Sequence, residues 1–230
     1  MPRQGSKADM IRSRFVRKSA KPGAKRRAKT ILLLGAKSIG KTSLIKRFID
    51  GSFPSSLPAT VEDRFQYDLG SGSNQLYCEI VDIDAFEFPP MRDLHIKEAC
   101  VIVLLYEAKN RKSFDVMKKL YSIITSARDY PVPLVVVATK TDKLDSGEMM
   151  NEVKEHHVDE FVLDLNSSSS ADGVRHMNTS AKLGYNVSEA FGVAFAEVKN
   201  VFQNESLTGG SLGFTDQEDG DRSKCCCTLI

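Results

Sequence analysis

Residues 35–42 read Gly35-Ala36-Lys37-Ser38-Ile39-Gly40-Lys41-Thr42. They match the phosphate loop G-x-x-x-x-G-K-[ST], and they lie between an apolar run at 30–34 and a helical pattern at 43–50, which is the context the motif requires. Such a turn lets backbone NH groups converge on a phosphate, while the next helix directs its positive dipole end toward it. Lys41 adds a positive charge, and the Thr42 hydroxyl is a ligand for Mg²⁺. A chance glycine turn before a helix is the plain alternative.

Charge is distributed unevenly along the chain. Residues 1–29 contain 11 Lys and Arg against the single acid Asp9, whereas the other residues contain 21 basic and 29 acidic side chains. Because residues 1–29 also lack a sustained apolar stripe, we interpret them as a disordered basic arm. Such an arm can lie on anionic lipid, where each Lys or Arg contributes about 1 kcal/mol. Nuclear import through Lys25-Arg26-Arg27, nucleic-acid contact, a mitochondrial presequence and a solvated tail are the alternatives.

The length of 230 residues suits one domain with flexible ends. No apolar run approaches the roughly 18 residues of a membrane span, and the N-terminus lacks the apolar segment of a secretory signal. The five cysteines do not form a disulfide framework, because Cys78 and Cys100 lie in strand-like runs and Cys225, Cys226 and Cys227 are contiguous. The sequence therefore indicates a reducing compartment.

Strand and helix patterns alternate after the phosphate loop. Residues 53–65 form a loop that leads into an alternating strand, and a turn at 70–74 joins this strand to a second one at 75–81, which ends at Asp82. A carboxylate in that place lies where an open α/β sheet positions ligand groups.

The later segments continue the alternation. Strands are predicted at 100–106, 133–138 and 175–179, a helix at 148–161 and a Ser-rich loop at 166–173. Two further helices carry apolar stripes, formed by Phe114, Met117, Leu120 and Ile124 and by Val187, Phe191, Phe195, Val198 and Phe202. With right-handed crossovers, these elements predict an α/β fold with a mostly parallel sheet of about six strands and helices on both faces.

These residues resemble the Ras branch of the Ras superfamily of small GTPases over residues 30–203. Besides the phosphate loop, Thr60 matches the switch I threonine and Asp82 begins the D-x-x-G element. Thr139-Lys140-Thr141-Asp142 matches the guanine motif [NT]-K-x-D, and Ser180-Ala181-Lys182 matches the S-A-K element. The resemblance implies a three-layer P-loop fold that binds GTP or GDP together with Mg²⁺.

Guanine selectivity follows from the chemistry of one carboxylate. Guanine presents two adjacent donors, which Asp142 can accept in a charge-assisted pair and which adenine lacks. The resemblance implies that the Lys140 stem lies along the base, that the Ala181 NH meets its carbonyl and that Phe53 covers the purine. A helix-capping Asp142 and a core Phe53 are the alternatives.

The resemblance also implies a set of site residues. Thr42 and Thr60 bind Mg²⁺ directly and Asp82 binds it through water, while Lys41 and Thr60 assist catalysis. The residues that bind the nucleotide are Gly35, Ala36, Lys37, Ser38, Ile39, Gly40, Lys41, Thr42, Ser43, Phe53, Thr60, Ala85, Thr139, Lys140, Asp142, Ser180, Ala181 and Lys182.

Departures from the family are concentrated where GTP is hydrolysed. Lys37 and Ala85 replace glycines, Asp84 replaces a small residue, and Phe86 replaces the glutamine that orients the attacking water. We therefore expect weak hydrolysis, with Lys37 pairing with Asp84 or with the phosphate. A pseudo-GTPase that presents its switch surfaces without nucleotide cycling is the alternative.

Partners follow from the same resemblance. Residues 57–65 are expected to meet Ras-type effectors, whose sheet would add to the following strand, and the acids Glu62 and Asp63 would attract a basic partner. Exchange and activating proteins would contact the switches. Residues 88–94 are similar to the switch II of Rhes and Dexras relatives, and residues 142–180 include about a dozen more residues than in Ras itself. No nucleic-acid partner is expected.

The chain ends in Cys227-Thr228-Leu229-Ile230, a C-a-a-X prenylation pattern that favours geranylgeranylation. One lipid chain anchors only marginally, so palmitoylation of Cys225 or Cys226 and the basic arm are candidate second signals. A metal-binding or oxidation-prone cysteine cluster is the alternative. With a flexible acidic tail at 204–230, these features predict a lipid-anchored protein on the cytoplasmic face of the plasma membrane or of an internal membrane.

Overall fold

A central sheet of seven strands organises the computed structural model, which describes residues 15–16, 29–54, 56–69, 76–142, 153–168 and 173–208. The strand order is β1-β3-β4-β2-β5-β6-β7. The strands are β1 (Phe15–Val16), β2 (Lys29–Gly35), β3 (Glu62–Asp68), β4 (Tyr77–Ile83), β5 (Val101–Glu107), β6 (Leu134–Thr139) and β7 (Arg175–Asn178). Strands β4, β2, β5, β6 and β7 run parallel, whereas β3 is antiparallel to β4 and β1 is antiparallel to β3.

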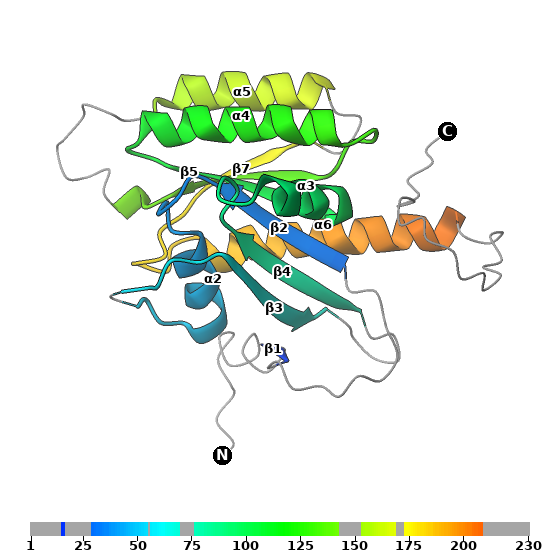
Figure 1. The fold of residues 1–230 in the computed structure, drawn as a ribbon, viewed down its shortest axis with the longest axis horizontal. Helices are drawn as coiled ribbons and strands as arrows, with labels where there is room; N and C mark the ends of the chain where they lie inside the picture. Colours follow the sequence, from blue (N-terminus) through cyan, green and yellow to red (C-terminus); the bar gives the residue numbers. More distant parts are fainter. Residues whose placement is uncertain are drawn as a thin grey trace, which may run out of the picture.

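Helices cover both faces of this sheet (Figure 1). They are α2 (Lys41–Asp50), α3 (Pro89–Glu98), α4 (Arg111–Ala127), α5 (Glu155–Ser168) and α6 (Val187–Thr208). Helices α2 and α6 pack on one face, and α3, α4 and α5 pack on the other. Strand β2 is buried on both sides, because Ile31 and Leu33 face the first layer while Leu32 and Leu34 face the second. The fold class predicted from the sequence is therefore confirmed, with six strands as expected and β1 in addition.

The predicted apolar stripes hold the helices on the sheet. All four stripe residues of α4 are buried, and so are the first four of α6, whereas Phe202 at the end of its stripe is 37% exposed. Phe48 of α2 stacks on Phe191 of α6, with ring centroids 4.4 Å apart. Burial of such aromatic side chains contributes more than their area alone, by about 0.5–1.5 kcal/mol for each well-oriented pair.

The boundaries of α5 differ from the predicted ones. The described helix begins at Glu155 rather than at residue 148, and it continues through Asn166 to Ser168, where the sequence predicted a loop. Leu165 is buried at this end, and the Ser167 hydroxyl donates to the Asp164 carbonyl, so the polar residues are satisfied without leaving the helix. Residues 143–152 and 169–172, which complete both predictions, lie outside the described residues.

Both ends of the chain were predicted to be irregular. Two residues of the basic arm form β1, which the sequence did not predict. Lys29, the last residue of the arm, begins β2, and residues 204–208 of the tail belong to α6 rather than to an irregular segment. Residues 1–14 and 17–28, and the end of the tail with Cys225, Cys226 and Cys227, lie outside the described residues. Within the described part of the chain, none of the helices combines the length and the apolarity needed to cross a membrane.

Candidate functional site

The phosphate loop connects β2 to α2, and both of its motif glycines are required by geometry. A Cβ atom at Gly35 would lie 2.6 Å from the Leu105 carbonyl oxygen and would also clash with Ile39 Cδ1. Gly40 has a φ of 101°, in the left-handed region that side chains avoid. The loop can therefore turn tightly against β5 only with these residues, and it ends at the N-terminus of α2, a position that favours anions.

Lys41 fills the inside of this loop. Its side chain is only 9% exposed, and Nζ donates to the carbonyl oxygens of Gly35 and Ala36 at 3.2 Å each. Burial lowers the pKa of Lys41, and the charges of Asp82 and Asp84 act in the opposite direction. A buried ammonium is stable only where it is paired. Lys41 is thus placed to complement an anion at the loop.

The three predicted magnesium ligands come together beside Lys41. Thr42 Oγ1 lies 3.0 Å from Thr60 Oγ1, and it donates to Asp82 Oδ2. Burial raises the pKa of Asp82, while the Thr42 hydrogen bond and the charge of Lys41 oppose this shift. The second carboxylate oxygen, Asp82 Oδ1, is buried and has no hydrogen-bond partner among the described residues. A coordinated cation, or water bound to it, would satisfy this oxygen, so the residues fit Mg²⁺.

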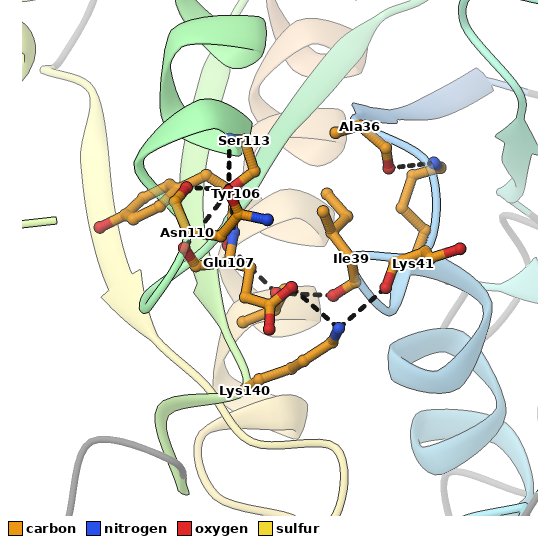
Figure 2. A network of polar contacts seen from close by, with 10 residues as sticks. Ala36, Ile39, Lys41, Tyr106, Glu107, Asn110, Ser113 and Lys140 are labelled. Carbon is orange, nitrogen blue, oxygen red and sulfur yellow. Dashed lines mark hydrogen bonds and ion pairs between the residues drawn. The ribbon is translucent and has the colours of Figure 1, made fainter. Parts of the chain in front are cut away.

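The predicted base-binding motifs are joined to the phosphate loop. Thr139 is buried at the end of β6, and its hydroxyl lies 2.7 Å from the Ile39 carbonyl oxygen and 3.0 Å from that of Tyr106. Lys140 adopts a left-handed conformation with a φ of 56°. Its Nζ donates to the Ser38 carbonyl at 2.8 Å, so the Lys140 side chain reaches back over the loop (Figure 2).

The two halves of the predicted guanine site contact each other. The Ser180 hydroxyl donates to Asp142 Oδ1, and the Leu183 NH donates to the same hydroxyl at 3.1 Å. The Thr141 NH also donates to the Thr179 carbonyl, at 3.2 Å. These bonds fix the Asp142 carboxylate next to the S-A-K element, in which Ala181 is half-buried and Lys182 is exposed.

Two other predicted binding residues lie near opposite ends of α2. Phe53 follows the helix and is 45% exposed, which excludes the alternative of a core phenylalanine. Ser43, in the first turn of α2, is half-buried.

Sequence reasoning missed one charged residue of this site. Glu107 is the last residue of β5, and its Oε2 accepts a hydrogen bond from Lys140 Nζ at 2.9 Å (Figure 2). The Glu107 NH donates to the Ser113 hydroxyl at 2.9 Å, and the Asn110 side chain caps α4 beside it. A carboxylate at the carboxyl end of a parallel strand was the signal that identified Asp82, and it would have identified Glu107 too.

The departures from the family pattern also lie together. Lys37 Nζ is 3.6 Å from Asp84 Oδ2, so the predicted ion pair between these residues is present. Asp84 Oδ1 accepts the backbone NH groups of Phe86 and Glu87, at 3.1 and 3.3 Å. Partial burial raises the pKa of Asp84, but the two NH groups and the charges of Lys37 and Lys41 outweigh it, and the net pKa is lowered. Asp84 is therefore an ionised carboxylate that its own loop stabilises.

Neither Ala85 nor Phe86, the two residues that follow Asp84, has a polar side chain that could orient a water molecule. Ala85 is completely buried, and its carbonyl accepts a hydrogen bond from Arg92 at 3.2 Å. Phe86 is 46% exposed, and a phenyl ring has neither donor nor acceptor for a water molecule. The Asp84 NH donates to the Val61 carbonyl at 3.1 Å, which connects this loop to the residue after Thr60.

Comparison with known proteins agrees with this geometry. The model of the Ras family matches residues 30–200. The chain is 28% identical over 170 residues to the GTP-binding protein Di-Ras2 of Macaca fascicularis, covering 70% of this chain and 77% of that protein. It is 30% identical over 181 residues to the human GTP-binding protein Rhes, covering 74% and 64%. It is 28% identical over 187 residues to the Ras-related protein rapC of Dictyostelium discoideum, covering 78% and 63%.

Proposed function

Because the chain belongs to the Ras family, we propose that it is a lipid-anchored GTP-binding switch that hydrolyses GTP slowly. The observation that carries this proposal is the contact between the Asp142 carboxylate and Ser180, beside a Lys140 side chain that reaches the phosphate loop. Relatives of this chain are named as GTP-binding proteins, and the motif residues that such a function needs are present here.

The proposed ligand is GTP or GDP together with Mg²⁺. When bound, Mg²⁺ would neutralise phosphate charge, and the residues that would hold it are Thr42, Thr60 and Asp82, the last through water. Lys41 would contact the phosphates from inside the loop, and Asp142 would accept the two guanine donors. Thr60 would report the nucleotide state to residues 57–65, which we propose as the surface for effectors.

Slow hydrolysis is proposed because the position of the water-orienting glutamine carries Phe86. The Lys37–Asp84 ion pair supports the same proposal, since the Lys37 side chain is exposed and would obstruct an arginine supplied by an activating protein. A pseudo-GTPase is the second candidate function, favoured by the same substitutions. It differs from the proposed switch in one measurable way, because it does not turn the nucleotide over.

Two measurements test the proposal. Mass spectrometry of nucleotide retained on the purified full chain should find GTP or GDP. Titration with GTP and with ATP, in the presence of Mg²⁺, should show at least a hundredfold preference for GTP. Comparable affinities would refute guanine selectivity, and bound GTP that never converts to GDP would favour the pseudo-GTPase.

Membrane anchoring is proposed from the C-terminal Cys227 and from the basic arm. Replacing Cys227 with Ser removes the thiol that would be prenylated, so the protein should move to the soluble fraction of cells. Deleting residues 1–28 should weaken membrane binding only in part, and less at high salt, because such charges are screened over about 8 Å at physiological ionic strength. If the Cys227→Ser variant stays on membranes while the deletion variant leaves them, the proposed order of the two signals is wrong.

A further inference from the structure

Strand β1 covers part of one edge of the sheet. Phe15 is opposite Tyr67 and Val16 is opposite Gln66 in an antiparallel pair, next to the carboxyl half of β3 (Figure 1). Without this pair, β3 would be the outermost strand on this side. An edge strand presents unpaired NH and C=O groups, to which any extended segment can add.

The same edge is the one that the proposed function gives to an effector. Strand β3 begins at Glu62, within residues 57–65. Glu62 is ion-paired with Arg64, so the exposed acid Asp63 is the residue that favours a basic, extended partner. The chain carries a segment of that chemistry. In the sequence, Phe15 and Val16 have high β-propensity, and they are flanked by Arg12, Arg14, Arg17 and Lys18.

We propose that the N-terminal arm is an intramolecular competitor, whose β1 segment occupies the β3 edge and must leave before a partner strand can add along the whole edge. This inference rests on the proposed effector function of β3. Because β1 has only two residues, the pairing is weak by itself, and the arm can be displaced.

Residues 17–28, which connect β1 to β2, keep β1 close to the β3 edge and so make a weak pair effective. Lys29 of β2 is opposite Cys78 of β4, Cys78 is opposite Tyr67 of β3, and Tyr67 is opposite Phe15. These four residues form one row across the sheet, so Phe15 lies about 14 Å from Lys29, three strand spacings away. Residues 17–28 could span up to about 40 Å when extended. This connection is therefore long enough for β1 to reach the β3 edge, and it gives the arm an effective concentration on the order of millimolar.

Contacts other than β1 hold β3 in place, so a partner strand can replace β1 without moving β3. Tyr67 is 5% exposed, and its ring stacks on Phe195 of α6, with centroids 4.4 Å apart. The strand does not depend on β1 for its position, because β4 pairs with all seven of its residues. Removal of the arm should therefore uncover the edge and leave the sheet folded.

Hydrogen exchange in the full chain tests the pairing. In the Phe15→Pro/Val16→Pro variant, which cannot donate from either residue, the edge-facing amide of the two residues opposite β1, Gln66 and Tyr67, should exchange at least tenfold faster than in the wild type. The matched control is Phe15→Tyr/Val16→Ile, which keeps both NH groups and should exchange like the wild type. Unchanged exchange in the proline variant would overturn the proposal.

Competition tests the same idea without relying on the proline variant. A synthetic peptide of residues 11–20, added up to millimolar concentration, should shift the amide resonances of Glu62–Asp68 in a variant that lacks residues 1–20. The shifts should be at least tenfold smaller in the full chain, where the tethered arm competes. No shift in the truncated variant, or equal shifts with a scrambled peptide of the same composition, would overturn the proposal.

Nucleotide titration of the same proteins keeps the two proposals apart. GTP affinity should be equal in the full chain, in the two double substitutions of β1 and in the variant that lacks residues 1–20, because β1 lies away from the phosphate loop. Loss of guanine selectivity in all of them would refute the proposed function and leave the arm result standing, whereas a failed exchange experiment with normal GTP binding would refute the arm proposal alone.

Discussion

The base side and the γ-phosphate side of this site lie on either side of the same loop, and they differ in what their polar groups do. On the base side, Thr139, Lys140 and Ser180 form bonds that run from the phosphate loop to the Asp142 carboxylate. On the other side, the Asp84 carboxylate is satisfied by its own loop and by Lys37. One side keeps the motif residues that the family resemblance assigns to base recognition, while the other carries Lys37, Asp84 and Phe86, which depart from the family pattern.

The difference leads us to propose that binding and turnover depend on separate residues even within one loop. A buried polar network loses about 1–3 kcal/mol when one partner is removed, so each member of the base side is constrained by the others. The Phe86 side chain takes no part in such a network, and because its ring is 46% exposed we expect its replacement to change stability little.

The largest effect concerns activation of hydrolysis. An arginine finger accelerates GTPases of this type by about 10³–10⁵-fold, whereas we expect less than about tenfold here, because Phe86 cannot orient water and Lys37 obstructs the finger. Single-turnover hydrolysis, measured with and without the catalytic domain of a Ras-type activating protein, checks this. The control variant, Lys37→Gly/Asp84→Ala/Ala85→Gly/Phe86→Gln, should regain part of the response. Rapid turnover by the unmodified chain would contradict the proposed division.

The second effect concerns base recognition. Replacing Asp142 with Asn removes the charge that accepts the two guanine donors, and the GTP affinity should fall by about 1–3 kcal/mol, or roughly 5- to 150-fold. Preference should shift toward xanthine nucleotides. Asp115→Asn on the surface of α4 is the matched control, and isothermal titration with GTP and XTP is the measurement. Equal GTP affinity in the two variants would show that Asp142 does not read the base.

The sequence predicted those parts of the molecule that depend on local spacing. The phosphate loop required two glycines and a helix start, so Gly35 and Gly40 were recognisable without knowledge of their neighbours. Strands β2 and β5 were recognisable because strands buried on both faces read as continuous apolar runs.

Other features depend on pairing between distant residues, which local patterns do not contain. The β1–β3 pair joins residues about 50 positions apart, and nothing in Phe15 and Val16 alone distinguishes a strand from a coil. The end of α5 was missed because serine and asparagine favour loops on average, whereas here Leu165 packs into the core and keeps the last turn helical. The place of Glu107 at the carboxyl end of β5 could have been recognised from the sequence, but its partner could not, because Lys140 reaches it from the end of the neighbouring strand β6.

The third prediction concerns the base side and tests whether Glu107 positions the Lys140 side chain. Its ion pair is one of the two bonds that hold the Lys140 ammonium, so Glu107→Ala should loosen that side chain and weaken GTP binding by about three- to tenfold, within the range of a typical net hydrogen bond. Glu107→Gln keeps an acceptor and should lose less. Stopped-flow measurement of GTP dissociation at low and high salt tests this. If Ala and Gln variants release GTP at the wild-type rate, Glu107 does not position Lys140.

The smallest effect concerns Lys37 and Asp84, and it tests whether the two departures compensate each other. Lys37 is two-thirds exposed, so their coupling should be about 0.5 kcal/mol, or roughly twofold in affinity. Lys37→Gln alone should weaken GTP binding, because it leaves the Asp84 charge near the phosphate. Asp84→Asn, which keeps an acceptor for the Phe86 and Glu87 NH groups, should strengthen it, and the effect of the double variant should differ from the sum of the two single effects by this coupling.

The pH dependence of this pair gives an independent check of the same coupling. The pKa of Asp84 is lowered in the folded chain, so its contribution to stability is complete above the ordinary aspartate pKa of about 3.9 and is lost as the pH falls through the lowered value. A double-mutant cycle on the free energy of urea unfolding should therefore show coupling at pH 7 that decreases as the pH falls through the lowered pKa of Asp84. Strict additivity at pH 7 in low salt would mean that Lys37 and Asp84 changed independently. Coupling that does not decrease with pH in step with protonation of Asp84 would mean that the pair interacts through packing rather than through charge.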